Sequence, residues 1–385
     1  MSDALTALFR DFDHGRISRR RLLQVLGVTV AARPLSAFAQ GQCGGARAGT
    51  PECDTTPAPL PFEPTGWKTT ILDHFSMQVA DYQKEAAYFA ALMNWKIRSD
   101  DGTKAVLDIG DWGGIVIRGG YEAPPAPARA AGAAAGATGG GAQGAAGGGR
   151  GGGGGRGGGR GRAPRLAAVD SFCWGIEPWD AKTVEAELRK RGLTPVADND
   201  GRGFESFHVK DADGFDLQIS NGNRQNRRRT PANGSVAAPA PFDHTNWKTV
   251  WLDHISFETS NYKEQVAFYT ALLGWQPGQD EGSQNETQVP GVGGLIIRRG
   301  GGGGRGGAAT PPVRHAQIGH IAFGITPFDP DAVKAELEKR GLNAREDTGA
   351  TGDIHESVYK SYHTTTPNGF DLQISNVIEA PKPGL

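Results

Sequence analysis

The segment WLDHISFETSNYKEQVAFYTALLGW, residues 251–275, sets the organisation of the chain. Its first part alternates in polarity like a strand, and its second part carries apolar residues at the spacing of one helix face. An earlier segment, ILDHFSMQVADYQKEAAYFAALMNW at 71–95, repeats both parts with an offset of 180 residues. Each strand holds a histidine, His74 and His254. The repetition raises the question of whether the two histidines do the same work.

Further matches extend this repeat over most of the chain. The matched segments are GGIVIR (113–118) with GGLIIR (293–298), FCWGIEPWDAKTVEAELRKRGL (172–193) with IAFGITPFDPDAVKAELEKRGL (321–342), and DGFDLQISN (213–221) with NGFDLQISN (368–376). Their offsets are 180, 149 and 155 residues, so the copies differ in loop length at the same places. In the second copy, Asp329–Pro330 and Gly341 are typical of the two ends of a helix. Each copy therefore reads as strand, helix, strands, loop, strand, helix, strands.

The composition is globular apart from glycine, of which there are 58 among 385 residues. This length predicts two or three domains. The formal net charge of −1 gives no reason to expect a nucleic acid or an anionic membrane as partner. Arginines in the glycine-rich tract lack the interleaved aromatic residues of nucleic-acid binders.

The N-terminal segment SRRRLLQVLGVTVAARPLSAFAQ resembles a twin-arginine export signal. Arg19 and Arg20 precede a short apolar run, which is too short to span a bilayer, and an Ala-x-Ala cleavage pattern ends at Ala39. The resemblance predicts an exported protein, periplasmic or extracellular, without a stable membrane anchor. Cys43 and Cys53 can pair across a short loop or remain unpaired.

The sequence predicts the following division of the chain. The parts are a signal peptide at 1–39, a linker at 40–65, a first copy at 66–222 with a Gly/Ala/Arg-rich insertion at 123–164, a linker at 223–245, a second copy at 246–378 with a Gly-rich loop at 299–312, and a tail at 379–385. The two glycine-rich tracts have too few apolar side chains to form a core, so we expect flexible surface loops there.

Three strands of the second copy are apolar on one face and polar or small on the other. The residues of the second kind are His254 and Ser256, then His320, Ala322 and Gly324, then Asp371, Gln373 and Ser375. Such a face leaves room for a ligand, and we expect it to line a cup.

The pattern LDHISF…FYTALLGW…GHIAFGI…TPNGFDLQI resembles the glyoxalase/bleomycin-resistance/extradiol dioxygenase superfamily, the vicinal oxygen chelate (VOC) proteins. Both copies match, so the resemblance covers nearly all of the chain outside the signal, linkers and glycine-rich tracts. It implies an α+β fold of two tandem VOC domains. Each is expected to consist of paired βαβββ modules that form a cupped mixed sheet around a divalent metal ion.

The resemblance also implies a ligand set for that ion, which we expect to be iron(II), zinc or manganese. First strands supply His254 and His320, and the last strand supplies Gln373, four residues after Gly369. The superfamily most often has glutamate at this last position, and a neutral glutamine leaves the charge of the ion uncompensated. Asp371, two residues earlier on the same face, is an alternative ligand.

Groups for proton transfer are expected just before the last strand. His355 and His363 stand at spacings close to those of the extradiol motif's histidine and tyrosine, and Tyr359 lies between them. A histidine or tyrosine beside a metal-bound substrate can move protons near neutral pH. The first copy keeps His208 at the equivalent of His363, which favours a structural role for that position.

The first copy is predicted to lack a metal. It retains His74 and Gln218, but Ser171 replaces the second histidine, and one good ligand does not hold a metal against water. Cys173 lies in an apolar strand and reads as a small buried residue.

Two functions of different classes fit these residues. The first is a metal-dependent enzyme, a dioxygenase, lyase or isomerase, that acts on a small oxygen-bearing substrate through the second copy. The alternative is a metal-free small-molecule binding protein of the bleomycin-resistance kind. Either implies a small-molecule partner, and the sequence leaves the oligomeric state open.

Overall fold

The structure is a computed structural model, and it describes most of both copies. The described residues are 54–110, 112–122, 165–222, 238–278, 280–300, 316–349 and 352–377. The expected signal peptide, Cys43, Cys53, the tail, almost all of both glycine-rich tracts and most of the second linker lie outside these residues. No helix within the described ranges is long and apolar enough to cross a membrane.

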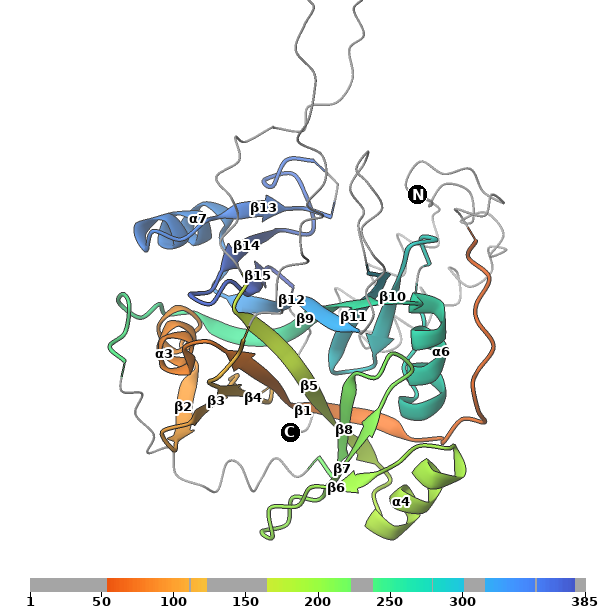
Figure 1. The fold of residues 1–385 in the computed structure, drawn as a ribbon. Coiled ribbons are helices and arrows are strands. Elements are labelled where there is room, and N and C mark those ends of the chain that lie inside the picture. Colours follow the sequence, from red (N-terminus) through yellow and green to blue (C-terminus); the bar gives the residue numbers. More distant parts are fainter. Residues whose placement is uncertain are drawn as a thin grey trace, which may run out of the picture. The chain divides into compact units, whose positions relative to one another are not determined.

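The first copy forms an eight-stranded mixed sheet in the order β2-β3-β4-β1-β5-β8-β7-β6 (Figure 1). Its strands are β1 (Lys68–Val79), β2 (Lys96–Asp100), β3 (Lys104–Asp108), β4 (Gly114–Arg118), β5 (Ala167–Glu177), β6 (Val196–Ala197), β7 (Ser206–Lys210) and β8 (Asp216–Ser220). The central strands β1 and β5 are antiparallel, and each pairs in parallel with the last strand of its own module, β4 or β8. The sheet is thus two βαβββ modules joined through their first strands, as expected.

The second copy forms a seven-stranded sheet in the order β10-β11-β9-β12-β15-β14-β13. Its strands are β9 (Lys248–Thr259), β10 (Gln284–Val289), β11 (Gly293–Arg299), β12 (Gln317–Thr326), β13 (Arg345–Asp347), β14 (Ser361–Thr365) and β15 (Asp371–Ser375). The equivalent of β2 does not form a strand, and its bridges include an isolated one between Gln276 and Gln288. Pro277 has no N–H to donate to a ladder, and a Cβ at Gly278 would lie 2.0 Å from the Glu286 carbonyl oxygen. The first module of this copy therefore departs from the expected βαβββ pattern by one strand.

Four helices follow the first strands of the modules, and local sequence sets their ends. They are α3 (Tyr82–Leu92), α4 (Ala181–Lys190), α6 (Tyr262–Leu273) and α7 (Pro330–Lys339). At α7 the Asp329 carboxylate accepts from the backbone N–H of Ala332 at 2.9 Å, and Gly341 beyond its end has a φ of 70°. The predicted ends of this helix are confirmed.

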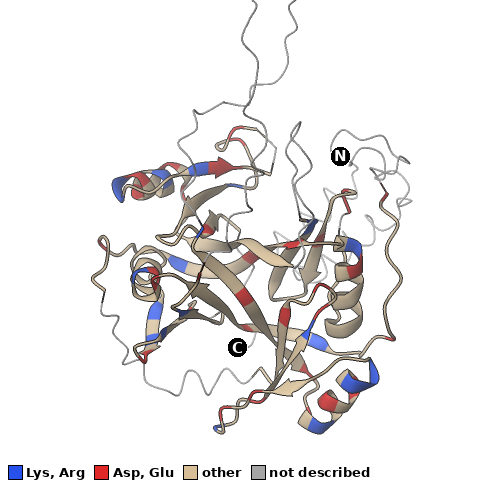
Figure 2. Cartoon of the chain, viewed as in Figure 1, with Lys and Arg blue, Asp and Glu red and all other residues tan. Residues whose placement is uncertain are grey.

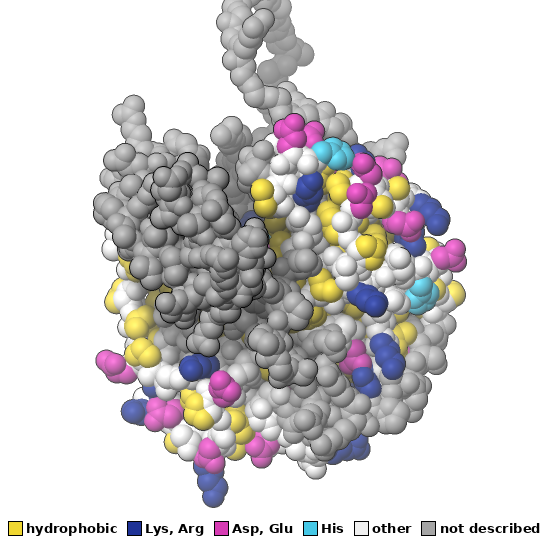
Figure 3. Space-filling view, turned by 180° about the vertical axis from the view of Figure 1, so that it is seen from behind, with side chains coloured by type: hydrophobic (Ala, Val, Ile, Leu, Met, Phe, Trp, Pro, Cys, Tyr) yellow, Lys and Arg dark blue, Asp and Glu magenta, His cyan; other side chains and the backbone are white. Residues whose placement is uncertain are grey.

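Charges of both signs are mixed along α4 and α7 (Figure 2) and over the face seen in Figure 3.

The apolar faces of the two sheets share one core. Residues of both copies belong to a single cluster of buried hydrophobic side chains. Phe172 on β5 contacts Phe257 on β9 with ring centroids 5.7 Å apart, and Phe75 on β1 stacks with Phe323 on β12 at 6.3 Å. The two sheets lie within one compact unit, which comprises Pro57–Gln279 and Gln284–Leu385. Burial of these faces against each other leaves the polar faces available for a site.

The residue just before each copy completes the hydrogen bonding of the other copy's first helix. The last carbonyls of a helix have no partner within it. Thr245, directly before the second copy, donates to the Leu92 carbonyl at the end of α3 at 2.6 Å. Thr65, directly before the first copy, donates to the Leu272 carbonyl in α6 at 2.7 Å. This exchange follows the internal repeat and fixes the two copies to each other.

Candidate metal centre

One row of side chains crosses the polar face of the second sheet, which is the face that carries His254, His320 and Gln373. Strand register places His254 opposite Ala322, Ala322 opposite Gln373, and Gln373 opposite His363. His320 lies in the next row, opposite Ser256 and Asp371. Ala322, which lies between His254 and Gln373 in this row, carries only a methyl group. The period-two assignment of these strand faces agrees with the register.

His254 and His320 turn their imidazoles toward a common point. Their Nε2 atoms are 3.0 Å apart. Burial, together with the neighbouring His254 and His363, lowers the pKa of His320 to about 2, so His320 is neutral at physiological pH. A neutral imidazole presents a nitrogen lone pair to an electrophile. His320 thus has the protonation state that metal ligation requires.

Asp253 is a site residue that sequence reasoning missed. The period-two pattern assigns it to the apolar face, but β9 carries one extra residue here, because Ala322 pairs with His254 and Phe323 with Leu252. The bulge turns the Asp253 carboxylate onto the polar face, where Oδ1 lies 3.2 Å from His254 Nδ1. A carboxylate only accepts, so His254 carries its proton on Nδ1 and its Nε2 is free to bind. The sequence carries one sign of this role, because an aspartate directly precedes the histidine in both copies, as Asp73–His74 and Asp253–His254.

The side-chain amide of Gln373 is held in one orientation by Tyr359 and Ser361. Gln373 Nε2 is 2.9 Å from the Tyr359 hydroxyl and 2.7 Å from Ser361 Oγ. The Tyr359 hydroxyl donates its proton to Asp253 Oδ2 at 3.1 Å, and Ser361 donates to the Asp347 carbonyl at 2.8 Å. Both hydroxyls must therefore accept from Gln373, which assigns the nitrogen to them and the oxygen to the opposite side.

The Gln373 oxygen is thereby left as a buried acceptor. Gln373 is 1 % exposed, and its Oε1 has no hydrogen-bond partner among the described residues. A buried acceptor without a donor costs about 1–3 kcal/mol. A cation or a ligand donor at this atom would remove that cost.

His363 is clamped between two carboxylates. Its Nδ1 is 2.9 Å from Asp371 Oδ1 and its Nε2 is 3.2 Å from Asp347 Oδ2. Burial lowers the pKa of His363, but the hydrogen bonds to Asp347 and Asp371 outweigh it and the net shift is upward. Asp371 also pairs with Arg345 at 3.0 Å. His363 and Asp371 are thus engaged with each other and with Asp347 and Arg345.

The first copy repeats this clamp around His208. Its Nδ1 is 2.7 Å from Asp216, and its Nε2 is 3.4 Å from Asp198. Asp198 and Asp216 are the equivalents of Asp347 and Asp371. A clamp that occurs in both copies supports a structural role for this histidine position.

The other two residues expected to act in proton transfer lie in different surroundings. Tyr359 belongs to the cluster, where burial and the charge of Asp253 raise the pKa of its hydroxyl. His355 has a side chain 56 % exposed, and its Nε2 lies 3.6 Å from Asp331 on α7. Within the described ranges, no contact joins His355 to the histidine pair.

The residues fit a divalent ion at the His254–His320 pair. Two nitrogens that each lie about 2.1 Å from one ion, at a right angle, are about 3.0 Å apart, which is the separation found here. Gln373, in the same row as His254, offers Oε1 as an oxygen ligand. His320, His363 and Asp371 also bring ligand atoms within 4.8 Å of one another. In that alternative group both His363 nitrogens already contact carboxylates, so we favour the set of His254, His320 and Gln373.

Comparison of the sequence with protein-family models and with curated proteins gives no match. Solved structures do match. The Mn(II)-bound glyoxalase from Novosphingobium aromaticivorans aligns with a TM-score of 0.50 at 15% identity, over 82% of this chain and 89% of its own. The 2,3-dioxygenase LapB from Pseudomonas sp. KL28 aligns with a TM-score of 0.52 at 13% identity, over 82% and 95%. The fold is that of the VOC proteins.

A third alignment agrees with this fold. Homoprotocatechuate 2,3-dioxygenase from Brevibacterium fuscum, in its complex with 3,4-dihydroxyphenylacetate, gives a TM-score of 0.50 at 14% identity, over 86% of each chain. At such identities the likeness establishes the tandem VOC architecture alone. Chemistry has to be argued from the residues on the polar faces.

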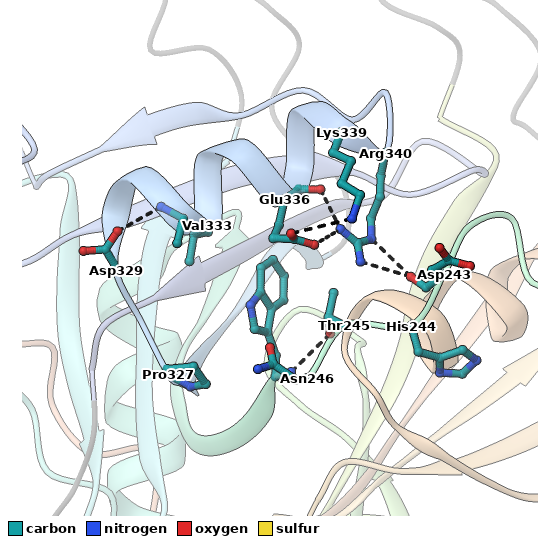
Figure 4. Close-up of a pocket in the computed structure, with 12 residues that line it drawn as sticks. Asp243, His244, Thr245, Asn246, Pro327, Asp329, Val333, Glu336, Lys339 and Arg340 are labelled. Atoms are coloured by element: carbon teal, nitrogen blue, oxygen red, sulfur yellow. Dashed lines mark hydrogen bonds and ion pairs between the residues drawn. The ribbon is translucent and has the colours of Figure 1, made fainter.

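A separate cavity of about 570 Å³ lies between α7 and residues 243–247 (Figure 4). Arg340 crosses it and donates to the Asp243 carbonyl oxygen at 3.0 and 3.3 Å while contacting Glu336. In the first VOC copy, Arg191 donates to the carbonyls of Glu63 and Pro64 at 2.9 and 3.2 Å. These repeated arginines anchor the segment that leads into each first strand. The cavity is therefore part of the scaffold, and no residue of the candidate metal centre lines it.

Proposed function

We propose that the chain is a metal-dependent enzyme of the VOC type that acts on a small substrate with neighbouring oxygen atoms. The reaction would take place on the polar face of the second copy. His254, His320 and Gln373 would hold the ion. The observation that carries this proposal is the pair of converging Nε2 atoms, with a buried amide oxygen in the His254 row that has no donor among the described residues.

When bound, a divalent ion would polarise the substrate oxygens or activate dioxygen. Residues of the chain have separate tasks. Asp253 holds the proton of His254 on Nδ1 and fixes the orientation of its ring. Tyr359 accepts from Gln373 and donates to Asp253, so it ties the third ligand to that carboxylate. The upward-shifted pKa of His363 favours the imidazolium, whose ring centroid lies 4.9 Å from that of His320.

A metal-free binding protein is the second candidate. A separation of 3.0 Å between the Nε2 atoms is also a hydrogen-bond distance, with His320 donating to His254. A neutral Gln373 supports this reading, because an anionic ligand would serve a metal better. In that case its Oε1 would accept a hydrogen bond from a donor group of the ligand.

Binding of manganese(II), followed by its electron paramagnetic resonance, distinguishes the two candidates. His320→Ala should weaken manganese binding at least tenfold, since it removes one of three ligands. Gln373→Glu should tighten binding about tenfold or more, because a carboxylate offsets the charge of the ion. Asp371→Asn should leave the affinity within about twofold, because Asp371 is engaged by His363 and Arg345.

His355→Ala is the matched control, since it removes an exposed histidine outside the cluster. Its affinity should equal that of the wild type. Titrations of the same variants with iron(II) and zinc test whether the effect of each substitution on affinity depends on the ion. If neither His320→Ala nor Gln373→Glu changes the affinity for manganese, the enzyme proposal fails and the metal-free candidate stands.

A further inference from the structure

The first copy has its own row of potential ligands at the place equivalent to the His254 row. Register places His74 on β1 opposite Cys173 on β5, and Cys173 opposite Gln218 on β8. Cys173 occupies the position of Ala322, the small residue between His254 and Gln373 in the second copy. A thiol thus stands where the second copy has only a methyl group. The sequence pattern shows a small buried residue here but not its neighbours.

A carboxylate joins this row through the same bulge as in the second copy. β1 carries one extra residue, because Leu72 pairs with Trp174 and His74 with Cys173. Asp73 therefore turns toward His74, and its Oδ1 lies 2.7 Å from His74 Nδ1. Ligand atoms of Asp73, His74 and Cys173 all lie within 4.8 Å of one another. Two of the three residues are almost fully buried, Asp73 at 2 % and Cys173 at 0 % exposed.

We propose that Asp73, His74 and Cys173 form a second metal site, for a zinc-class ion. Thiolate, imidazole and carboxylate are the three side-chain donors that zinc takes in proteins. A thiolate also selects against the harder ions manganese and magnesium. The two copies would then bind different ions, since the second copy offers nitrogen and oxygen donors only. This proposal does not depend on the enzyme proposal for the second copy.

The surroundings of this site favour a structural ion over a catalytic one. Phe204 stands at the position equivalent to Tyr359, two residues before the serine that accepts from the glutamine amide. Its ring faces His74 at a centroid distance of 6.4 Å. The first copy therefore lacks the hydroxyl that ties the ligands together in the second. An ion here would join β1 to β5, the two central strands of the first sheet.

Cobalt(II) binding to the full chain tests the site, because a thiolate bound to cobalt gives a charge-transfer band in the near ultraviolet. The starting protein carries Cys43→Ser, Cys53→Ser and His320→Ala. These changes leave Cys173 as the only thiol and remove a ligand from the second copy. We expect one equivalent of cobalt to produce the band, and zinc to displace it.

Two variants in that background then decide the ligands. Cys173→Ala should abolish the band, and alanine is the residue that the second copy carries at this position, so the fold is expected to persist. His74→Ala should weaken cobalt binding at least tenfold. A missing band in the starting protein, or a band of unchanged affinity in His74→Ala, overturns the proposal.

Discussion

Replacing Trp275 with alanine should destabilise the protein by about 3–5 kcal/mol. Trp275 is 1 % exposed and stacks on Tyr269 of α6 with centroids 4.4 Å apart. It also meets Trp174 on β5 edge to face at 5.1 Å, and its indole Nε1 donates to Thr69 Oγ1 at 2.9 Å. Trp174 and Thr69 belong to the first copy. Removal of the indole would leave a cavity between the copies and take one hydrogen bond from the Thr69 hydroxyl, which keeps its own bond to the Leu273 carbonyl.

Two further variants separate ring packing from hydrogen bonding. Trp275→Phe keeps an aromatic ring against Tyr269 and loses the donor to Thr69, so we expect a cost of about 1–2 kcal/mol. Trp95→Ala tests whether the equivalent tryptophan of the first copy matters equally. Trp95 stacks on Phe89 at 4.9 Å and donates to Thr249, next to the start of the second copy's first strand, at 2.8 Å. Urea unfolding followed by circular dichroism measures all three. A loss below about 1 kcal/mol for Trp275→Ala would show that the copies do not depend on this contact.

Much of the fold could be predicted because its signals are local. The duplication is visible in matched segments, and Asp329, Pro330 and Gly341 mark the two ends of α7 by their own chemistry. Residues that alternate along a strand also indicate their face, so the sequence predicts His254 and Gln373 on one face of the sheet.

Other features could not be predicted, because they depend on contacts between distant segments. Asp253 reaches the polar face only through a bulge, and a bulge is set by pairing with β12 rather than by the residues of β9. The orientation of the Gln373 amide follows from the acceptors to which the Tyr359 and Ser361 hydroxyls donate. His355 has a suitable spacing in the sequence, but the loop directs its side chain toward Asp331 on α7.

The interface between the copies contains two buried carboxylates in complementary positions. Glu85 on α3 accepts from the side-chain amide of Asn368 at 2.8 Å, and Glu85 is the equivalent of Gln265 on α6. At the corresponding contact of α6, the carboxylate comes from the turn before β8, as Asp211. The helix supplies the neutral donors Gln265 and Tyr269. Each contact thus pairs one acid with a neutral partner, which avoids two like charges in one buried place.

Asp211 should make the stability of the protein depend on pH between about 4 and 6. Burial raises the pKa of this carboxyl from 3.8 to about 6, although Tyr269 and the backbone N–H groups of Phe215 and Asp213 donate to it. The folded protein therefore binds the proton more tightly than the unfolded chain. Stability from this group is fully present below pH 3.8 and is lost as the pH rises through 6. A shift of this size is worth at most about 3 kcal/mol.

Asp211→Asn should remove this dependence, because asparagine carries no charge to desolvate and its amide can donate where a protonated carboxyl would. Gln265 Oε1 lacks a hydrogen-bond partner among the described residues and is the acceptor for that donor once its own amide turns. Other carboxylates titrate alike in both proteins, so the informative quantity is the difference in unfolding free energy between variant and wild type. From pH 4 to pH 7 this difference should move in favour of the variant by about 2–3 kcal/mol. Urea unfolding at several pH values measures it. A difference that stays constant over this range would mean that Asp211 is charged in the interface without penalty, and that Tyr269 and the backbone donors fully replace its hydration.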